Sequence, residues 1–412
     1  TFKLTWKEKV RQSLWASIEV YPLPKWLYTK TETGDDIPKE TLGTQFNNHW
    51  SNKMSMALGT GPYMLSEYQA DKRIKLTKNE DYWGTMPPID AIEYQIIKDP
   101  GQAFTRLRAD ELDFTSMSPP DYEEYVLEGG ADGPFETGDL EHKVVKRPVY
   151  YYLGWNMNKP MFAEAKVRQA MTHAFNRKAI VRDVLKGLGE VTTGPYLPGH
   201  PANNPEVSPY PYDLEKAKQL LTEAGWKDTD DDGIREKVID GKEIEFKFKM
   251  LAYNKPTARK FLAIFKEDLR KIGVIMNPSP VDWSIMQKKM NEGDFSAYTG
   301  GWALGWEIDP YQIWHSSQAD VAKGSNRVGF RNERADAIIE ELRRTFDKDK
   351  RIELLREFHM IVHEQQPYTF FYALKQAYAW QPALEHVVFQ KVRPVDVALP
   401  WWVDTSKREE NK

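Results

Sequence analysis

The residues best suited to binding chemistry lie in one short segment, residues 300–317 (GGWALGWEIDPYQIWHSS). There Trp302 and Trp306 are interleaved with Gly301 and Gly305. Glycine lets a backbone approach another group closely, and an indole offers a flat apolar face with one polar N–H group. These features are typical of the wall of a ligand-binding cleft.

The same segment could instead be a buried loop of the core that holds its tryptophans inside. We favour the cleft, because several polar side chains in the segment would be costly to bury together: Glu307, Asp309, His315, Ser316 and Ser317. The candidate ligand-binding residues of this segment are therefore Trp302, Leu304, Gly305, Trp306, Glu307 and Asp309.

Motifs of the common enzyme classes are missing from the sequence. It contains no phosphate-binding glycine loop, no G-x-S-x-G elbow and no H-E-x-x-H pair. Carboxylate pairs for glycoside hydrolysis can be drawn, Glu307 with Asp309 or Asp110 with Glu111, but a chain with 61 acidic residues offers many such pairs. We predict a protein that is not an enzyme and needs no cofactor, and keep a cleft hydrolase with catalytic carboxylates as the alternative from another class.

Two histidines have the spacing of metal ligands on one helix face. His359 and His363 stand four residues apart, but His359 also continues the apolar positions Ile352, Leu355 and Val362. We predict structural histidines, packed or partly exposed, in preference to a metal site.

An acidic loop imitates the first half of a calcium-binding EF-hand loop. Asp228, Asp230 and Asp232 alternate before Gly233, but the twelfth position is Ile239, where a bidentate Glu would be needed. We predict a structural turn, with a weak cation site as the alternative.

Composition limits the class of protein. The 412 residues are 41% hydrophobic and 29% charged, which suits a folded chain of two to three domains. The 57 basic and 61 acidic residues give a net charge of -4, which argues against nucleic acid as a partner. No uncharged apolar run reaches 18 residues, and cysteine is absent, as suits an oxidising compartment.

Hydrophobic periodicity predicts alternating strands and helices, as in a mostly parallel sheet. The expected strands are 63–68, 73–78, 89–97, 112–114, 147–158, 243–250 and 368–372, with strand-like sequence over 387–402. The expected helices are 102–109, two within 167–187 separated by the cap Asn176, 214–224 capped by Asp213, 256–272, 282–291, 334–346 and 347–365.

The N-terminal residues 1–7 (TFKLTWK) alternate like a half-buried strand, with Phe2, Leu4 and Trp6 on one face. No start methionine or signal sequence precedes them. We expect the chain to begin inside a larger fold, and expect an N-terminal fragment of the same protein as one partner.

Four stretches together resemble a known family. They are GTGPYMLSEYQADKRIKLTKNEDYWG (59–84), VRQAMTHAFNRKAIVRDVL (167–185), YDLEKAKQLLTEAGW with DTDDDGIREK (212–237), and the GW pair at Gly301. In order and spacing they resemble the extracellular solute-binding proteins, family 5, of ABC importers, which include oligopeptide-, dipeptide- and nickel-binding proteins.

The resemblance implies an α/β, type II periplasmic-binding-protein fold, in which two lobes are joined by a two-segment hinge. We expect residues 1–146 to form a partial lobe 1, residues 147–372 a continuous lobe 2, and residues 373–412 to return to lobe 1.

The resemblance also bears on single residues. In peptide-binding relatives an aspartate after the GW pair binds the ligand's terminal ammonium group, whereas the matching position here is Gly305. Either Glu307 or Asp309 substitutes, or the ligand has no free amino terminus. Asn326 matches a polar position that faces ligand in the family, with a structural asparagine turn as the alternative, and Phe371 completes the candidate ligand-binding residues.

The function so implied is that of a substrate-binding subunit, periplasmic or extracellular at the outer face of the cytoplasmic membrane. It would capture a small solute, for which we favour a peptide, in the cleft between the two lobes and deliver it to an ABC permease in the membrane. An oligosaccharide is the alternative ligand for the same fold, because aromatic faces suit sugars equally well.

Overall fold

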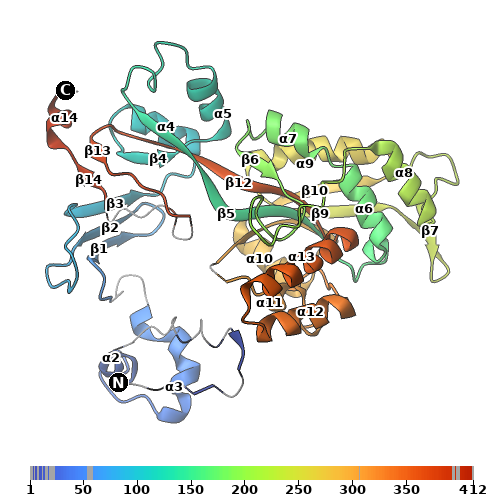
Figure 1. Cartoon of the computed structure of the whole chain (residues 1–412), viewed down its shortest axis with the longest axis horizontal. Helices are drawn as coiled ribbons and strands as arrows, with labels where there is room; N and C mark the ends of the chain where they lie inside the picture. The colour runs from blue at the N-terminus through green and yellow to red at the C-terminus, as the bar shows by residue number, and fades with distance from the viewer. Residues whose placement is uncertain are drawn as a thin grey trace. The chain divides into compact units, whose positions relative to one another are not determined.

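The computed structural model describes residues 24–52, 59–305, 307–391 and 400–410, together with Lys3, Thr5, Trp6, 9–11, Ser13, Ser17 and Val395. Contacts within the chain divide it into two compact units. Unit 1 consists of Thr1–Ser17, Lys146–Gln376 and Lys391–Arg393, and unit 2 of Ile18–Val145, Ala377–Gln390 and Pro394–Lys412. The chain passes between the units within two long neighbouring strands, β5 (Glu141–Trp155) and β12 (Tyr368–Trp380) (Figure 1).

The chain changes unit between residues 145 and 146 and again between residues 376 and 377. We expected the lobe boundaries between residues 146 and 147 and between residues 372 and 373. Unit 1 covers most of the range expected for lobe 2. Thr1–Ser17, which we expected in lobe 1, is grouped with it. That a ligand binds in the cleft between the expected lobes stays a prediction.

Unit 1 is built on a mixed sheet. Its strand order is β10 (Ile275–Val281), β9 (Lys247–Tyr253), β11 (Ala297–Ala303), β5 and β12, with β6 (Gly189–Val191) also paired to β12. β10 and β11 both run parallel to β9, whereas β11 runs antiparallel to β5 and β6 antiparallel to β12. The expectation of a mostly parallel sheet is therefore wrong. A helix joins β9 to β10 and another joins β10 to β11, as the connection of parallel strands requires.

Helices cover both faces of this sheet. Leu153 and Trp155 of β5 belong to a core cluster with α6 (Ala165–His173), α8 (Leu214–Glu223) and α9 (Pro256–Arg270). Tyr150 and Tyr152, which alternate with them, belong to a second cluster with α10 (Trp283–Glu292), α12 (Glu333–Arg344) and α13 (Lys348–Gln365). This alternation follows from the period of two along a strand. The shorter helices of unit 1 are α7 (Arg177–Asp183), α11 (Tyr311–Trp314), η5 (Pro160–Phe162) and η6 (Ser316–Gln318).

The predicted helix caps are confirmed. Asn176 accepts a hydrogen bond from the N–H of Ala179 (3.1 Å), and Asp213 accepts one from Lys216 (2.8 Å). Gly225 has a φ of 84°, as a glycine that ends a helix commonly does.

The predicted strand 243–250 is in fact two strands. β7 (Glu236–Ile239) and β8 (Lys242–Glu245) form a separate hairpin, and β9 starts at Lys247. Between them the buried Phe246 donates its N–H to the carbonyl of Arg235 (2.7 Å), where the chain leaves the hairpin. Apolar and polar residues alternate straight through this junction, so periodicity could not reveal it.

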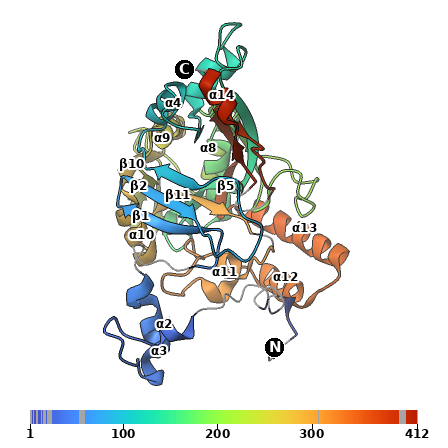
Figure 2. The ribbon, with the colours of Figure 1, turned by 90° about the vertical axis from the view of Figure 1, so that its left-hand side faces the viewer.

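Unit 2 contains the predicted hairpin and third strand. β1 (Tyr63–Gln69), β2 (Arg73–Lys78) and β3 (Ala91–Gln95) form an antiparallel sheet (Figure 2). β4 (Phe114–Ser116), two residues beyond its predicted start, pairs with the end of β12. The other elements of unit 2 are α2 (Lys25–Tyr28), α3 (Lys39–Gln45), η1 (Phe46–Asn48), η2 (Trp50–Asn52), α4 (Pro100–Arg108), α5 (Pro119–Tyr122), η4 (Glu123–Leu127), β13 (Leu384–Glu385), β14 (Trp402–Val403) and α14 (Thr405–Glu410).

Of the predicted strand 1–7, the structure describes Lys3, Thr5 and Trp6. None of these three residues is in a strand, and Trp6 is exposed. The other four positions lie outside the described residues.

Candidate functional site

The three parallel strands of unit 1 end at the same edge of the sheet. β9 ends at Tyr253, which pairs with Val281 at the end of β10, and the neighbouring β11 ends at Ala303. In open α/β sheets, ligands bind outside the carboxyl ends of such strands. We use the name carboxyl edge for the residues Tyr253, Asn254, Lys255, Trp283 and Trp302.

Large aromatic side chains are accessible at the carboxyl edge. Trp283 is 52% exposed and Tyr253 is 38% exposed, and their ring centroids lie 5.8 Å apart at an interplanar angle of 68°. The ammonium group of Lys255 lies 5.2 Å from the centroid of the Tyr253 ring. Arg259 donates two hydrogen bonds to the side-chain oxygen of Asn254, of 2.8 and 2.6 Å. The edge thus offers apolar faces next to cationic and amide groups.

Trp302 lies on β11 and is half-buried. One side of it packs against the core cluster that contains Tyr150 and Tyr152, and its indole N–H donates to the hydroxyl of Tyr368 (3.4 Å). The rest of the side chain is accessible to solvent, and its role as the wall of a ligand-binding cleft stays a prediction.

The carboxylates proposed to bind an ammonium group have other partners. Glu307 is bonded by Arg11 (2.9 Å) and by Arg351. Asp309 accepts a hydrogen bond from the N–H of Tyr311 (3.1 Å), and its other oxygen lies 3.5 Å from Arg343. Because arginines compensate both charges, we retain neither carboxylate as an anchor for a ligand's amino terminus.

Two of the predicted ligand-binding residues are buried inside unit 1. Phe371 is 1% exposed and packs edge-on against Phe175 and Phe261, so the prediction that it contacts ligand is wrong. Asn326 is 2% exposed and its side chain bonds the backbone of Phe330 in both directions (2.9 Å each), so the structure favours the asparagine turn. The sequence shows residue types but not which way the side chains point.

The remaining residues of the segment have varied surroundings. Leu304 is half-buried against the same core cluster as Trp302. Gly305 is exposed, and a Cβ built on it would meet no heavy atom within 4 Å. Trp306 lies outside the described residues.

His359 and His363 are packed, as predicted. His359 is fully buried. Its Nδ1 accepts from the N–H of Asn204 (2.9 Å), and its Nε2 bonds the hydroxyl of Thr193 (3.1 Å). His363 bonds the carbonyl of Thr193 (3.1 Å). Burial lowers the pKa of His359 to about 4, so the ring is neutral at pH 7.

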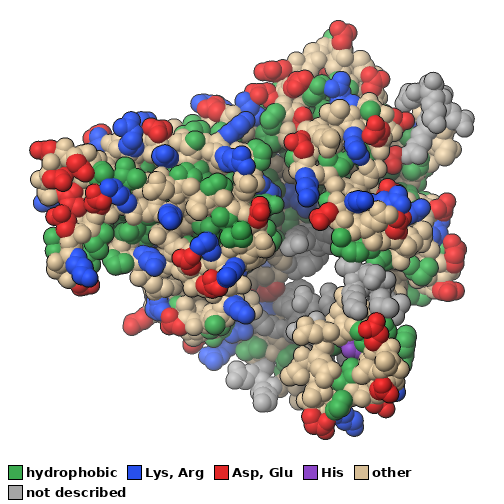
Figure 3. Space-filling model, turned by 180° about the vertical axis from the view of Figure 1, so that it is seen from behind, with side chains coloured by type: hydrophobic (Ala, Val, Ile, Leu, Met, Phe, Trp, Pro, Cys, Tyr) green, Lys and Arg blue, Asp and Glu red, His purple; other side chains and the backbone are tan. Residues whose placement is uncertain are grey.

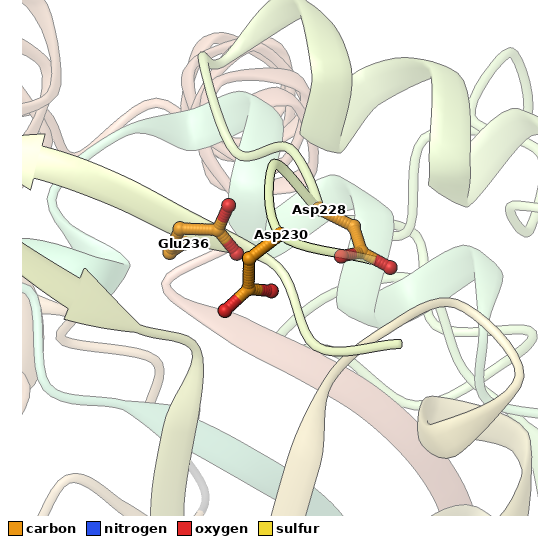
Figure 4. Close-up of side chains that lie close together, drawn as sticks. All are labelled: Asp228, Asp230 and Glu236. Carbon is orange, nitrogen blue, oxygen red and sulfur yellow. The ribbon is translucent and has the colours of Figure 1, made fainter. Parts of the chain in front are cut away.

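Three carboxylates gather at the acidic loop, as Figure 4 shows. Ligand oxygens of Asp228, Asp230 and Glu236 lie within 4.8 Å of one another. Position 12 of the EF-hand pattern is Ile239, but Glu236 at position 9 supplies a carboxylate that we did not predict. The buried Glu236 already accepts hydrogen bonds from the N–H and hydroxyl of Thr229, and Asp228 accepts one from the N–H of Gly233 (3.0 Å).

A pocket of about 560 Å³ lies beside this loop, at the edge where β10 begins. Among its lining residues are Lys218, Arg235, Arg270 and Lys271. The first, third and fourth each pair with a carboxylate three residues earlier in the chain, and Arg235 donates to the carbonyls of Trp226 and Ile272. On the face of the molecule in Figure 3, acidic and basic side chains are likewise interspersed. The carboxyl edge is therefore the better candidate for the ligand site.

Sequence reasoning missed Tyr253 and Trp283. Both stand at a junction where a strand gives way to a helix, since α9 starts at Pro256 and α10 at Trp283. An aromatic residue at such a junction is the signal that could have found them.

Comparison with known proteins supports the family. A sequence model of a protein family, described as bacterial extracellular solute-binding proteins, family 5 Middle, matches residues 1–324. The chain is 33% identical over 379 residues to the oligopeptide-binding protein AppA of Bacillus subtilis, which covers 89% of this chain and 66% of AppA. It is 30% identical over 342 residues to the heme-binding protein A of Haemophilus influenzae, over 82% of this chain and 56% of the relative.

The structure of Bacillus subtilis AppA in complex with a nonapeptide is similar to this chain, with a TM-score of 0.77 and 31% identity. The match covers 90% of this chain and 72% of that structure. The chain thus belongs to the family 5 extracellular solute-binding proteins. The predicted α/β, type II periplasmic-binding-protein fold is confirmed. Among the described residues, no helix is long and apolar enough to span a membrane.

Proposed function

We propose that this chain is the substrate-binding component of an ABC importer and binds a peptide at the carboxyl edge of unit 1. The observation that carries the proposal is the pair of exposed aromatic rings, Tyr253 and Trp283, at the ends of parallel strands. Aromatic side chains supply a large contact area at low entropic cost, which suits a ligand of variable sequence.

The polar groups of the edge fit a peptide as well. Lys255 can pair with a peptide carboxylate, and Asn254 can bond a peptide backbone group. The relative AppA is named for oligopeptide binding and was solved with a nonapeptide. The partner that receives the peptide is a membrane permease, and the protein works in the periplasm or at the outer face of the cytoplasmic membrane. No bond is made or broken in this role, so no catalytic group is needed.

Native mass spectrometry can test the proposal with the 412-residue chain and an equimolar pool of peptides of two to nine residues. We expect a mass shift equal to one peptide. The strongest binder then serves as probe peptide in calorimetry. A pool of oligosaccharides, tested in the same way, examines the alternative ligand.

The variants Trp283→Ala and Trp302→Ala should each weaken binding of the probe peptide by about 1–3 kcal/mol, the usual loss for an aromatic anchor. Ile264→Ala is the matched control, because Ile264 is a 40% exposed apolar residue on α9. Binding of sugars but no peptide, or equal affinities for all four proteins, would refute the proposal.

A further inference from the structure

Three buried tyrosines lie behind Trp302. They are Tyr152 on β5, Tyr298 on β11 and Tyr368 on β12, and each is at most 2% exposed. The hydroxyls of Tyr152 and Tyr298 are 3.0 Å apart, and the rings of Tyr152 and Tyr368 are stacked with centroids 3.7 Å apart. We call these three residues the tyrosine cluster.

Two glycines make room for the tyrosine cluster. A Cβ built on Gly300 would lie 2.5 Å from Cζ of Tyr152, and one built on Gly154 would lie 2.6 Å from Cε1 of Tyr298. Neither glycine has a positive φ, so glycine is needed there for space and not for backbone conformation. The packing of the tyrosine cluster therefore explains the glycine at position 300, two residues before Trp302.

The tyrosine cluster accepts a hydrogen bond from Trp302. The indole N–H of Trp302 donates to the hydroxyl of Tyr368 (3.4 Å). That hydroxyl has a fixed place, because the Tyr368 ring is stacked on Tyr152 and lies 4.7 Å from the ring of Trp314. Trp302 is only half-buried, so its own packing constrains the indole from one side alone.

We propose that Tyr368 is a positioning residue that fixes the indole of Trp302 at the carboxyl edge and thereby sets peptide affinity. This inference rests on the proposed function. Tyr368 is fully buried and cannot touch the ligand itself. It acts by holding the indole in its binding orientation before the ligand arrives, which removes an ordering cost from binding.

Affinity for the probe peptide tests the coupling. Tyr368→Phe removes the hydroxyl, which bonds Trp302, Tyr152 and Tyr298. It should weaken peptide binding roughly 3- to 10-fold, the range expected for loss of the one hydrogen bond to Trp302. Trp302→Phe removes the indole N–H, and the double variant should bind no more weakly than Trp302→Phe alone. Tyr196→Phe is the control. Tyr196 is 1% exposed in the same core cluster, and its hydroxyl has no hydrogen-bond partner among the residues described.

The orientation of the indole can be measured without any ligand. In protein labelled with ¹⁵N at the tryptophan indoles, the Trp302 resonance is the one lost in Trp302→Phe. Tyr368→Phe should shift this resonance and speed its exchange with D₂O, whereas Tyr196→Phe should change neither.

The two measurements also separate this inference from the proposed function. If no peptide of the pool binds, the proposed function fails, while the indole resonance still tests the positioning. If peptides bind, but the affinity of Tyr368→Phe for the probe peptide stays within twofold of that of the unsubstituted protein, the inference is overturned. It is equally overturned if the losses of the two single variants simply add, because the hydroxyl would then act independently of Trp302.

Discussion

Protonation of His359 should lower the stability of the folded state more than protonation of an exposed histidine would. The ring is fully buried and both of its nitrogens are bonded, with Nδ1 accepting from the N–H of Asn204. A second proton at Nδ1 would break that bond and place a charge in the core. Burial also lowers the pKa values of His363 and His173, so their protonation acts in the same direction.

Stability should therefore fall in mild acid. Because the pKa of His359 is about 4 when folded and near 6.5 when unfolded, the unfolded chain binds the extra proton first as pH falls. The contribution is complete above pH 6.5 and is lost between pH 6.5 and 4, by about 3 kcal/mol for this residue. Over that pH range the melting temperature of His359→Gln should depend less on pH than that of the unsubstituted protein, because glutamine does not titrate.

His386→Gln is the control for this pH series, because His386 is exposed. It should leave the profile unchanged. An unsubstituted protein that melts at the same temperature at pH 4.5 and pH 7 would contradict the argument.

At Gly300 the size of the side chain alone decides whether a substitution destabilises the protein. Gly300→Ala would bring a methyl group 2.5 Å from Tyr152, and overpacking of this kind costs about 1–3 kcal/mol. Gly305→Ala places the same methyl group in open space and should be neutral. Urea denaturation of both variants measures the difference, and equal midpoints would show that the tyrosine cluster is not as tightly packed as described.

At the scale of elements, the sequence was informative wherever local chemistry decides the structure. Asp213 and Asn176 cap their helices as predicted, because a cap is formed within four residues. Prediction failed where partners distant in sequence decide. One alternating run becomes two strands at Phe246 because the pairing partner changes there. Its N–H donates to Arg235, eleven residues earlier in the chain, and its carbonyl accepts from Ile275 of β10.

The acidic loop should hold its shape without an ion. Asp228 and Glu236 each accept hydrogen bonds from within the loop, which satisfies carboxylate oxygens that a cation would otherwise need to bind. We expect a calcium chelator to leave the melting temperature unchanged. A fall of several degrees, reversed by added calcium, would show instead that the three carboxylates hold a stabilising cation.

At the scale of the whole molecule, four sequence stretches were enough to predict family and fold, because their order and spacing are specific. The site was harder to predict. Trp302 could be found from its glycine-rich surroundings, whereas Tyr253 and Trp283 are 30 residues apart and meet only because β9 and β10 pair in parallel. Strand order of this kind cannot be derived from periodicity, and neither can the burial of Phe371.

Photo-crosslinking with the probe peptide tests most directly that the carboxyl edge binds the ligand. A peptide that carries benzoylphenylalanine is irradiated with the 412-residue chain, and the modified residues are identified by tandem mass spectrometry. We predict adducts within 253–259, 283–287 and 301–305, which excess unlabelled peptide abolishes. Competed adducts confined to the opposite edge of the sheet, around Asp228–Arg235 and Arg270–Ile275, would contradict this account.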